Sequence, residues 1–341
     1  MNLFSENTIN KCVNIKIPWV EKYRPSKLDD LLLNSIIKDK IDYFLKNNTL
    51  PNIIITGKPG TGKTSTVILL AKELYKDNYE DNVLELNASD DRGLMVINSI
   101  IYPFCKKKLI KSHDSQINYK LIILDEADSV TSKAQQLLSV IITNFSYNTR
   151  IIFICNNISQ IIESIQSKCM IIKYPKISHD NAFNKIKQIC DEENMLYNNK
   201  SIELLITNTE NDLRMSINYL ECIYYTFGEL SEENINKLTQ KPKYEYIKNI
   251  IDNSINKEYK LVLDNIKELD KKGYTASDIL LTFMKYLFDD TISLNINSEK
   301  KHNIYVIISQ GYVRINNNIG SYLQLCGIIS EIYNYIISIN I

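Results

Sequence analysis

The residues best suited to chemistry lie between positions 57 and 65, where three of the chain's nine glycines occur. The string G-K-P-G-T-G-K-T follows a strand-like apolar run and precedes a helical pattern, which is the context that the phosphate-binding motif G-x-x-x-x-G-K-[ST] requires. Its glycines let the backbone turn and point N–H groups at phosphate oxygens, and the helix dipole adds positive potential. We therefore predict nucleotide binding by Gly57, Lys58, Pro59, Gly60, Thr61, Gly62, Lys63, Thr64 and Ser65.

A second group of reactive residues follows a buried strand. The apolar run 121–124 ends in the string D-E-A-D. Asp125 emerges at the end of the strand, where its carboxylate can hold Mg²⁺ directly or through water, and Glu126 is then placed to polarise an attacking water. Asp128 is equally well explained as an acid at a helix start, where its charge suits the helix dipole.

Taken together, the two motifs predict an ATPase site. Lys63 reaches the β- and γ-phosphates, and Thr64 and Asp125 bind Mg²⁺. The catalytic residues are then Glu126, Asp125 and Lys63. The expected cofactors are ATP and Mg²⁺.

Short β-branched runs alternate with helical patterns through the first half of the chain. Strands are predicted over 52–56, 83–86, 121–124, 150–155 and 170–174, with helices that include 65–75 and 133–143. Strands that alternate with helices form a parallel sheet covered on both faces. The predicted fold class is therefore α/β, with a parallel five-stranded sheet of the P-loop NTPase type.

The pattern changes after Pro175. Apolar residues now recur at three- and four-residue spacing, as in Phe183, Ile186 and Ile189, and no further strand is predicted. A linker is predicted over 240–243. We expect one α/β domain over residues 1–176 and two helical domains over 177–235 and 236–341.

Composition excludes several classes of protein. Forty basic and forty acidic residues balance, so any DNA contact must come from a local patch or from several subunits together. The seven cysteines form no C-x-x-C pair, which argues against a disulfide framework and against a zinc site. No apolar run reaches the roughly 18 residues of a membrane span, and the amino terminus lacks signal-peptide features. We expect an intracellular protein without membrane contact.

The sequence around the two motifs resembles that of the small subunits of replication factor C, a clamp-loading family of AAA+ ATPases. The matching strings are P-W-V-E-K-Y-R-P at 18–25, L-E-L-N-A-S-D-D-R-G at 84–93 and D-E-A-D at 125–128. Similarity continues, more thinly, to G-Y-T-A-S-D-I-L at 273–280, which resembles collar sequence. The resemblance implies an AAA+ ATP-binding module, a helical lid and an all-α collar for oligomerisation over the three ranges given above.

A function follows from the resemblance. In such loaders ATP lets a spiral of five subunits grip and open a ring-shaped clamp, primer–template DNA triggers hydrolysis, and the clamp is released closed around the DNA. The implied partners are other replication factor C subunits in a hetero-pentamer, a sliding clamp of the PCNA type and primer–template DNA. The implied location is the nucleus, or a cytoplasmic viral factory if the source is a large DNA virus.

Four further residues receive roles from the resemblance. Val20 and Arg24 fall where the opening segment packs around the nucleotide. Asn156 matches the sensor of the γ-phosphate, and Arg214 in N-D-L-R matches a second sensor carried by the lid. Without the resemblance, Asn156 is equally a turn-forming residue after a strand, and Arg214 a surface arginine.

The chain also departs from the family pattern. S-K-C at 167–169 stands where the family's S-R-C supplies an arginine to the neighbouring subunit, so Lys168 is either a weakened trans-acting finger or a surface lysine. Ser139 and Val140 replace two arginines and Asn98 replaces a basic residue, so DNA should be held less strongly. The lysines at 106–108, with Lys111, form either a compensating patch or a solvated loop.

Three alternatives stay open. The apolar residues of 97–104 fall where loaders press a helix edge onto the clamp, but core packing explains most of them equally well. The whole chain is an ATP-hydrolysing loader subunit or a scaffold subunit that binds ATP with negligible turnover. A different AAA+ remodeller, such as a branch-migration motor, fits the opening segment and the helical tail less well.

Overall fold

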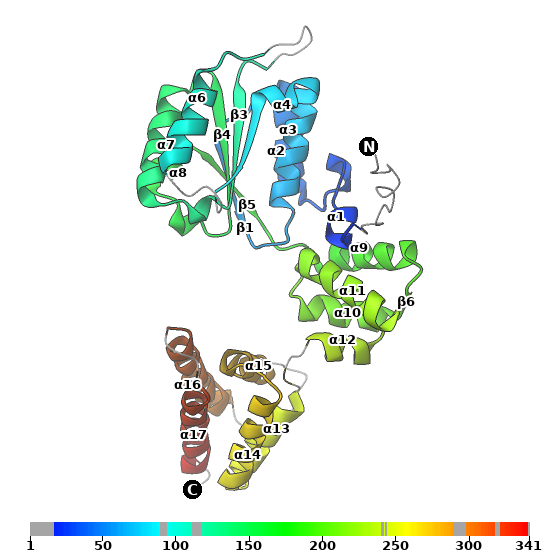
Figure 1. The fold of residues 1–341 in the computed structure, drawn as a ribbon. Helices are drawn as coiled ribbons and strands as arrows, with labels where there is room; N and C mark the ends of the chain where they lie inside the picture. The colour runs from blue at the N-terminus through cyan, green and yellow to red at the C-terminus, as the bar shows by residue number, and fades with distance from the viewer. Residues whose placement is uncertain are drawn as a thin grey trace, which may run out of the picture. The chain divides into compact units, whose positions relative to one another are not determined.

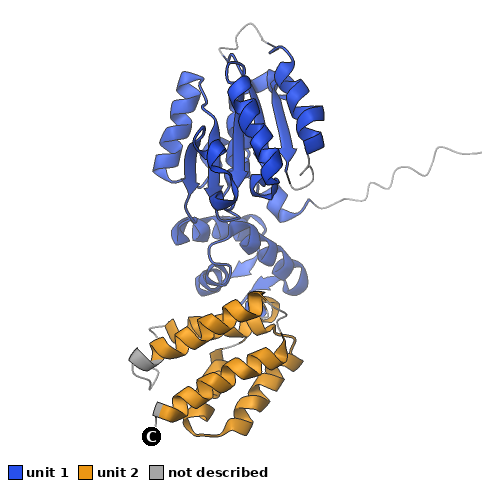
Figure 2. Cartoon of the chain, turned by 90° about the vertical axis from the view of Figure 1, so that its left-hand side faces the viewer, with its two compact units in different colours: residues 1–235 blue, residues 236–341 orange. Residues whose placement is uncertain are grey.

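The computed structural model describes residues 17–88, 94–110, 117–239, 242, 244–288, 298–317 and 321–339. The chain divides into two compact units, residues 1–235 and 236–341 (Figure 2). A further division of the first unit at residue 176 stays a prediction.

Five parallel strands form the central sheet of the first unit, in the order β2-β3-β4-β1-β5 (Figure 1). Their bounds are β1 (Ile53–Gly57), β2 (Val83–Asn87), β3 (Lys120–Asp125), β4 (Thr149–Cys155) and β5 (Met170–Tyr174). The five strands coincide with the predicted ones within a residue at each end, so the α/β prediction is confirmed. Because β1 lies beside β4 and β4 beside β3, the loop after β1 comes close to the carboxyl ends of β4 and β3.

Alternate residues of the buried strands face opposite sides of the sheet, which explains their nearly continuous apolar sequence. Ile53 and Ile55 join a core with helices α2 and α3, whereas Ile54 joins a core with η3 and α7. Helices therefore cover both faces, as predicted (Figure 1). The larger ones are α2 (Ser35–Asn47), α3 (Lys63–Tyr75) and α7 (Ser132–Asn144). The shorter ones are α1 (Trp19–Lys22), η1 (Leu28–Asp30), η2 (Lys76–Asn78), α4 (Tyr79–Asn82), α5 (Leu94–Val96), η3 (Ile97–Ile101), α6 (Tyr102–Lys106), η4 (Ala127–Ser129), η5 (Ile158–Gln160) and α8 (Glu163–Gln166).

Four helices follow β5, and the last of them crosses from the first unit into the second. They are α9 (His179–Glu192), α10 (Asn199–Asn208), α11 (Leu213–Phe227) and α12 (Glu232–Thr239). The side chains of Ser178, Asn198 and Asp212 accept hydrogen bonds from first-turn N–H groups, which fixes where α9, α10 and α11 begin.

The prediction that no strand follows Pro175 is wrong. Strands β6 (Leu196–Tyr197) and β7 (Glu229–Leu230) pair in parallel between the helices. Each has only two residues, which is too short for the alternating pattern that reveals a strand in a sequence.

All described elements of the second unit are helices, which confirms the all-α prediction. They are α13 (Tyr244–Ile255), α14 (Tyr259–Lys271), α15 (Ala276–Phe288), α16 (Ser298–Asn317) and α17 (Tyr322–Ile339). They share one apolar core, which includes Ile250, Ile266, Phe283 and Ile329. Of the predicted linker, only Pro242 lies within the described residues. No described helix combines the length and apolar character needed to cross a bilayer.

Candidate ATPase site

The loop after β1 adopts a backbone that favours glycine. Gly60 and Gly62 have φ angles of 72° and 83°, in the left-handed region. A Cβ atom on Gly57 would lie 2.5 Å from the carbonyl oxygen of Tyr174 on the neighbouring strand β5. Helix α3 begins at Lys63, directly after the loop. Tight turn, close packing and helix start together form a cradle for an anion.

Lys63 is 7% exposed, and its ammonium group is surrounded by acceptors. It donates hydrogen bonds to the carbonyl oxygens of Gly57 (2.7 Å) and Lys58 (2.8 Å) and to Oδ1 of Asn156 (3.0 Å). Burial lowers the pKa of Lys63, and the carboxylate of Asp125 opposes that shift. The predicted phosphate-binding lysine and the predicted γ-phosphate sensor are thus in direct contact.

The two predicted Mg²⁺ ligands lie next to each other. The hydroxyl of Thr64 donates a hydrogen bond of 2.8 Å to Oδ2 of Asp125. Adjacent ligands of an octahedral magnesium ion with bonds of about 2.1 Å stand about 3 Å apart, so this pair of hard oxygens fits Mg²⁺. The described part of the chain has no cluster of three or more His, Cys, Asp or Glu side chains that could hold a metal. Magnesium at this pair would therefore take its other ligands from phosphate oxygens and water.

Glu126 has a strained backbone at the end of β3. Its φ of 51° and ψ of 39° are left-handed, which costs a residue with a side chain about 1–2 kcal/mol. Its N–H donates to Oδ1 of Asp125 at 2.8 Å, and its carbonyl oxygen accepts from the N–H of Ser129 at 2.9 Å. These bonds hold the turn, and the exposed side chain of Glu126 lines the same cavity as the glycine loop.

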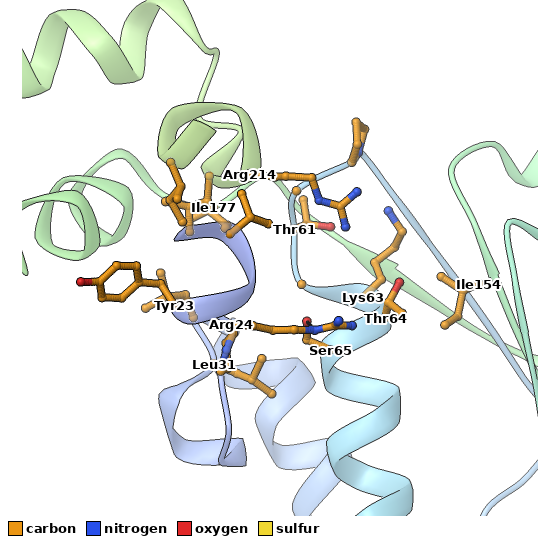
Figure 3. A pocket seen from close by; sticks show the side chains of 18 of the residues that line it. Tyr23, Arg24, Leu31, Thr61, Lys63, Thr64, Ser65, Ile154, Ile177 and Arg214 are labelled. Atoms are coloured by element: carbon orange, nitrogen blue, oxygen red, sulfur yellow. Dashed lines mark hydrogen bonds between the residues drawn. The ribbon is translucent and has the colours of Figure 1, made fainter. Parts of the chain in front are cut away.

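The first described segment joins helices α11 and α3. Trp19 is 2% exposed, and its ring packs on that of Tyr224 with centroids 5.1 Å apart. The N–H of Trp19 donates to Glu221 of the same helix at 3.0 Å. Further along the segment, Nε of Arg24 donates to the hydroxyl of Ser65 at 3.4 Å. Both helices therefore border one cavity, with this segment as part of its wall (Figure 3).

A single cavity of about 250 Å³ brings together most of the predicted site (Figure 3). The predicted residues that line it are Val20, Arg24, Pro59, Gly60, Thr61, Gly62, Lys63, Thr64, Ser65, Asp125, Glu126, Asn156 and Arg214. Gly57 and Lys58 are not among the lining residues, and their carbonyl oxygens accept hydrogen bonds from Lys63.

Sequence reasoning missed the apolar side of the cavity. Leu31, Ile177, Leu213 and Ile217 form it, in segments far apart in the sequence. Each of these residues also fits an ordinary core position, so no local signal could have identified it. An apolar wall beside a phosphate cradle suits a flat, aromatic base.

Lys168 is not among the residues that line the cavity, and its exposed side chain contacts α7 of the same chain. Its ammonium donates to the carbonyl oxygen of Ser139 (3.0 Å), to Oγ of Ser139 (2.9 Å) and to Oγ1 of Thr143 (2.9 Å). Each of its three protons therefore has an acceptor within the chain. A trans-acting role for Lys168 stays a prediction.

The other predicted contact surfaces have mixed exposure. Asn98, Val140 and the lysines at 106–108 are exposed, and Lys111 lies outside the described residues. In the segment 97–104, Ile97 and Ile101 are buried, whereas other apolar side chains are partly exposed. Core packing thus accounts for part of this segment, and contact of the exposed part with a clamp stays a prediction.

Two family models match the chain. Residues 53–175 match the AAA family, ATPases associated with various cellular activities, and the site therefore belongs to an AAA ATPase. Residues 242–331 match the C-terminal domain of replication factor C. The chain belongs to the family of replication factor C small subunits, which load clamps in DNA replication.

Several relatives match over most of the chain. Subunit 2 of replication factor C from Arabidopsis thaliana is 35% identical over 92% of each chain. Subunit 5 from Homo sapiens is 38% identical over 77% of each chain. A replication factor C small subunit of Acanthamoeba polyphaga mimivirus is 34% identical over 93% of this chain and 96% of that one. The matching strings also predict a special likeness to the subunit called the fifth in human and the third in yeast. The relatives carry different subunit numbers, so this finer ranking stays a prediction.

A solved structure of a RuvB variant from Thermotoga maritima has a TM-score of 0.51. It is 13% identical and covers 67% of this chain and 79% of that one. The likeness confirms the fold of the ATPase part.

Proposed function

We propose that this chain binds ATP with Mg²⁺ in the cavity beside the glycine loop and hydrolyses it as one subunit of a hetero-pentameric clamp loader. The observation that supports this most directly is a convergence of two contacts at neighbouring strand ends. Lys63 donates to Asn156 at 3.0 Å, and Thr64 donates to Asp125 at 2.8 Å. A cation, two metal ligands and a sensor therefore face one anion site.

The residues divide the chemistry among them. Lys63 and the N–H groups of the loop neutralise and orient the β- and γ-phosphates. Magnesium, when bound to Thr64 and Asp125, offsets the charge that develops on the phosphate oxygens. Glu126 polarises the attacking water, and Asn156 and Arg214 contact the γ-phosphate.

The proposed partners follow from the family. The relatives are named as subunits of replication factor C, so the proposed assembly is a complex with other such subunits. A PCNA-type sliding clamp and primer–template DNA are the proposed targets. The proposed location is the nucleus, or a viral factory in the cytoplasm if the source is viral, since a mimivirus relative matches nearly the whole chain.

Single-turnover ATP hydrolysis by the reconstituted complex tests the proposal. Glu126→Gln keeps the size of the side chain and removes its basicity, so the rate assigned to this subunit should fall by about 10²-fold or more. Glu80→Gln, an exposed position on α4, is the matched control. Equal rates for wild type and Glu126→Gln would exclude turnover here and leave the scaffold alternative. Co-purification with the other subunits and with the ring-shaped clamp tests the partners separately.

A further inference from the structure

Asp128, the last residue of D-E-A-D, contacts the loop that follows β4. Its Oδ2 atom accepts hydrogen bonds from the N–H of Asn156 at 3.0 Å and from the N–H of Asn157 at 3.2 Å. Asp128 itself is half-buried in η4, two residues after Glu126. A single carboxylate oxygen therefore holds two consecutive amides of the segment that carries the predicted sensor.

Asn156 is held at two other points as well. Its carbonyl oxygen accepts from the hydroxyl of Thr56 at 3.4 Å, and its Oδ1 accepts from Lys63 at 3.0 Å. Of these three bonds, only the one to Asp128 holds the backbone N–H of Asn156, and its acceptor is charged. Hydrogen bonds with one charged partner, which here include the bond from Lys63 as well as those to Asp128, are about twice as strong as neutral ones.

The alternative explanation of Asp128, as an acid that complements the dipole at a helix start, fits the geometry poorly. Helix η4 has three residues, which gives almost no dipole for a carboxylate to complement. The amides that Asp128 accepts from belong to a different segment, beyond strand β4. In both bonds the segment that carries the sensor donates and the acidic motif accepts.

We propose that Asp128 is a positioning residue that sets the sensor Asn156 for the γ-phosphate. Within D-E-A-D, Asp125 then serves the metal, Glu126 serves the water and Asp128 serves the sensor. The inference rests on the proposed function, because Asn156 can distinguish a γ-phosphate only if the cavity binds a nucleoside triphosphate.

Nucleotide discrimination by the full-length chain is the first test. The affinities for ATPγS and ADP are measured for wild type, Asp128→Ala, Asn156→Ala and the double variant. Loss of the two bonds should lower the preference for ATPγS over ADP by about tenfold, with the affinity for ADP unchanged. The double variant should lose no more than Asn156→Ala alone, because both changes remove one function. Asp81→Ala on α4, an exposed aspartate, is the matched control.

A conservative variant and a second measurement keep the test independent of folding. Asp128→Asn retains an acceptor oxygen, so it should lose less of the preference than Asp128→Ala. In the nucleotide-free chain, hydrogen exchange at the amides of residues 156 and 157 should quicken about tenfold in Asp128→Ala and remain at the wild-type rate in Asp81→Ala.

The outcomes separate the two levels of the hypothesis. If Asn156→Ala lowers the preference and Asp128→Ala does not, the inference is wrong and the proposed function stands. Equal losses for ATPγS and ADP in Asp128→Ala would reduce Asp128 to a structural residue and also overturn the inference. A wild-type chain that binds neither nucleotide would overturn the proposed function, and the inference with it.

Discussion

The hydroxyl of Thr64 and the carboxylate of Asp125 lie 2.8 Å apart, although 61 positions separate them in the sequence. The parallel order of β1, β4 and β3 brings the two strand ends to the same edge of the sheet. The two oxygens therefore have the spacing that the proposed pair of magnesium ligands needs.

Removing either oxygen should weaken magnesium-dependent hydrolysis. For Thr64→Val and Asp125→Asn we expect rates about 10²- to 10³-fold lower, since a catalytic metal contributes several kcal/mol to transition-state stabilisation. The measurement is the hydrolysis rate of the reconstituted complex as a function of Mg²⁺ concentration. Thr207→Val, on the exposed side of α10, is the control. An unchanged magnesium dependence in both variants would contradict the assignment.

Lys168 should contribute less to the neighbouring subunit than an arginine finger does. An arginine finger accelerates hydrolysis by roughly 10³ to 10⁵. Because the Lys168 ammonium already has three acceptors on α7, Lys168→Ala should lower turnover by less than about tenfold. It should also lower the free energy of unfolding by roughly 1 kcal/mol. Parallel ATPase and denaturation measurements check this, and a thousandfold loss of turnover would show that Lys168 acts in trans.

Trp19 should be required for both stability and nucleotide affinity. Replacing a fully buried aromatic side chain by alanine costs about 3–5 kcal/mol when the site cannot collapse. Trp19→Ala should therefore release the segment 18–25 from α11, and affinity should fall because Val20 and Arg24 lose their place in the cavity wall. Thermal unfolding, limited proteolysis and nucleotide titration measure the three effects. Trp19→Phe, which keeps an aromatic ring, should retain most of the stability, the protease resistance and the nucleotide affinity of the wild type. Wild-type affinity in Trp19→Ala would contradict the prediction.

Lys120 should make stability depend on pH in the alkaline range. It is 2% exposed and donates to the carbonyl oxygens of Phe104 (2.8 Å) and Lys107 (2.5 Å). Burial lowers its pKa from the ordinary value of 10.5. Between the lowered pKa and 10.5 the unfolded chain binds more protons than the folded one, so the free energy of unfolding rises with pH.

The comparison with Lys120→Met isolates this effect. Across that pH window the wild type should gain stability relative to the variant, as measured by denaturant titration at a series of pH values. Lys133→Met, at an exposed position, controls for the loss of a charge. A constant difference between wild type and Lys120→Met at every pH would contradict the assignment.

The parts of the site that could be predicted from the sequence are those whose residues lie close together along the chain. Gly60, Gly62 and Lys63 share one loop, and Asp125 follows a strand whose burial is evident from its apolar run. Strands β1, β3 and β4 were predictable because each is a short, mostly apolar run between helical patterns. Burial on both faces removes the alternation of apolar and polar residues that a half-exposed strand shows. The contrast between a short apolar run and the helical patterns beside it remains.

Contacts between distant segments could not be predicted in this way. Ile177 and Ile217 meet at the cavity only after the helices that follow β5 have packed, and each fits a core position as well. The partners of Asp128 lie 28 and 29 positions away, beyond a whole strand. Strands β6 and β7 have no pattern of their own, because tertiary packing creates the pair.

At Glu126, the backbone conformation lowers stability, while the side chain supplies the carboxylate that the proposed hydrolysis needs. Glycine adopts this conformation without the steric cost that a glutamate incurs. Glu126→Gly would thus relax the turn while deleting the carboxylate. The variant should fold at least as readily as the wild type, and it should bind its nucleotide without hydrolysing it. The steric cost at Glu126 is therefore a local loss of stability that accompanies the carboxylate which the proposed hydrolysis uses.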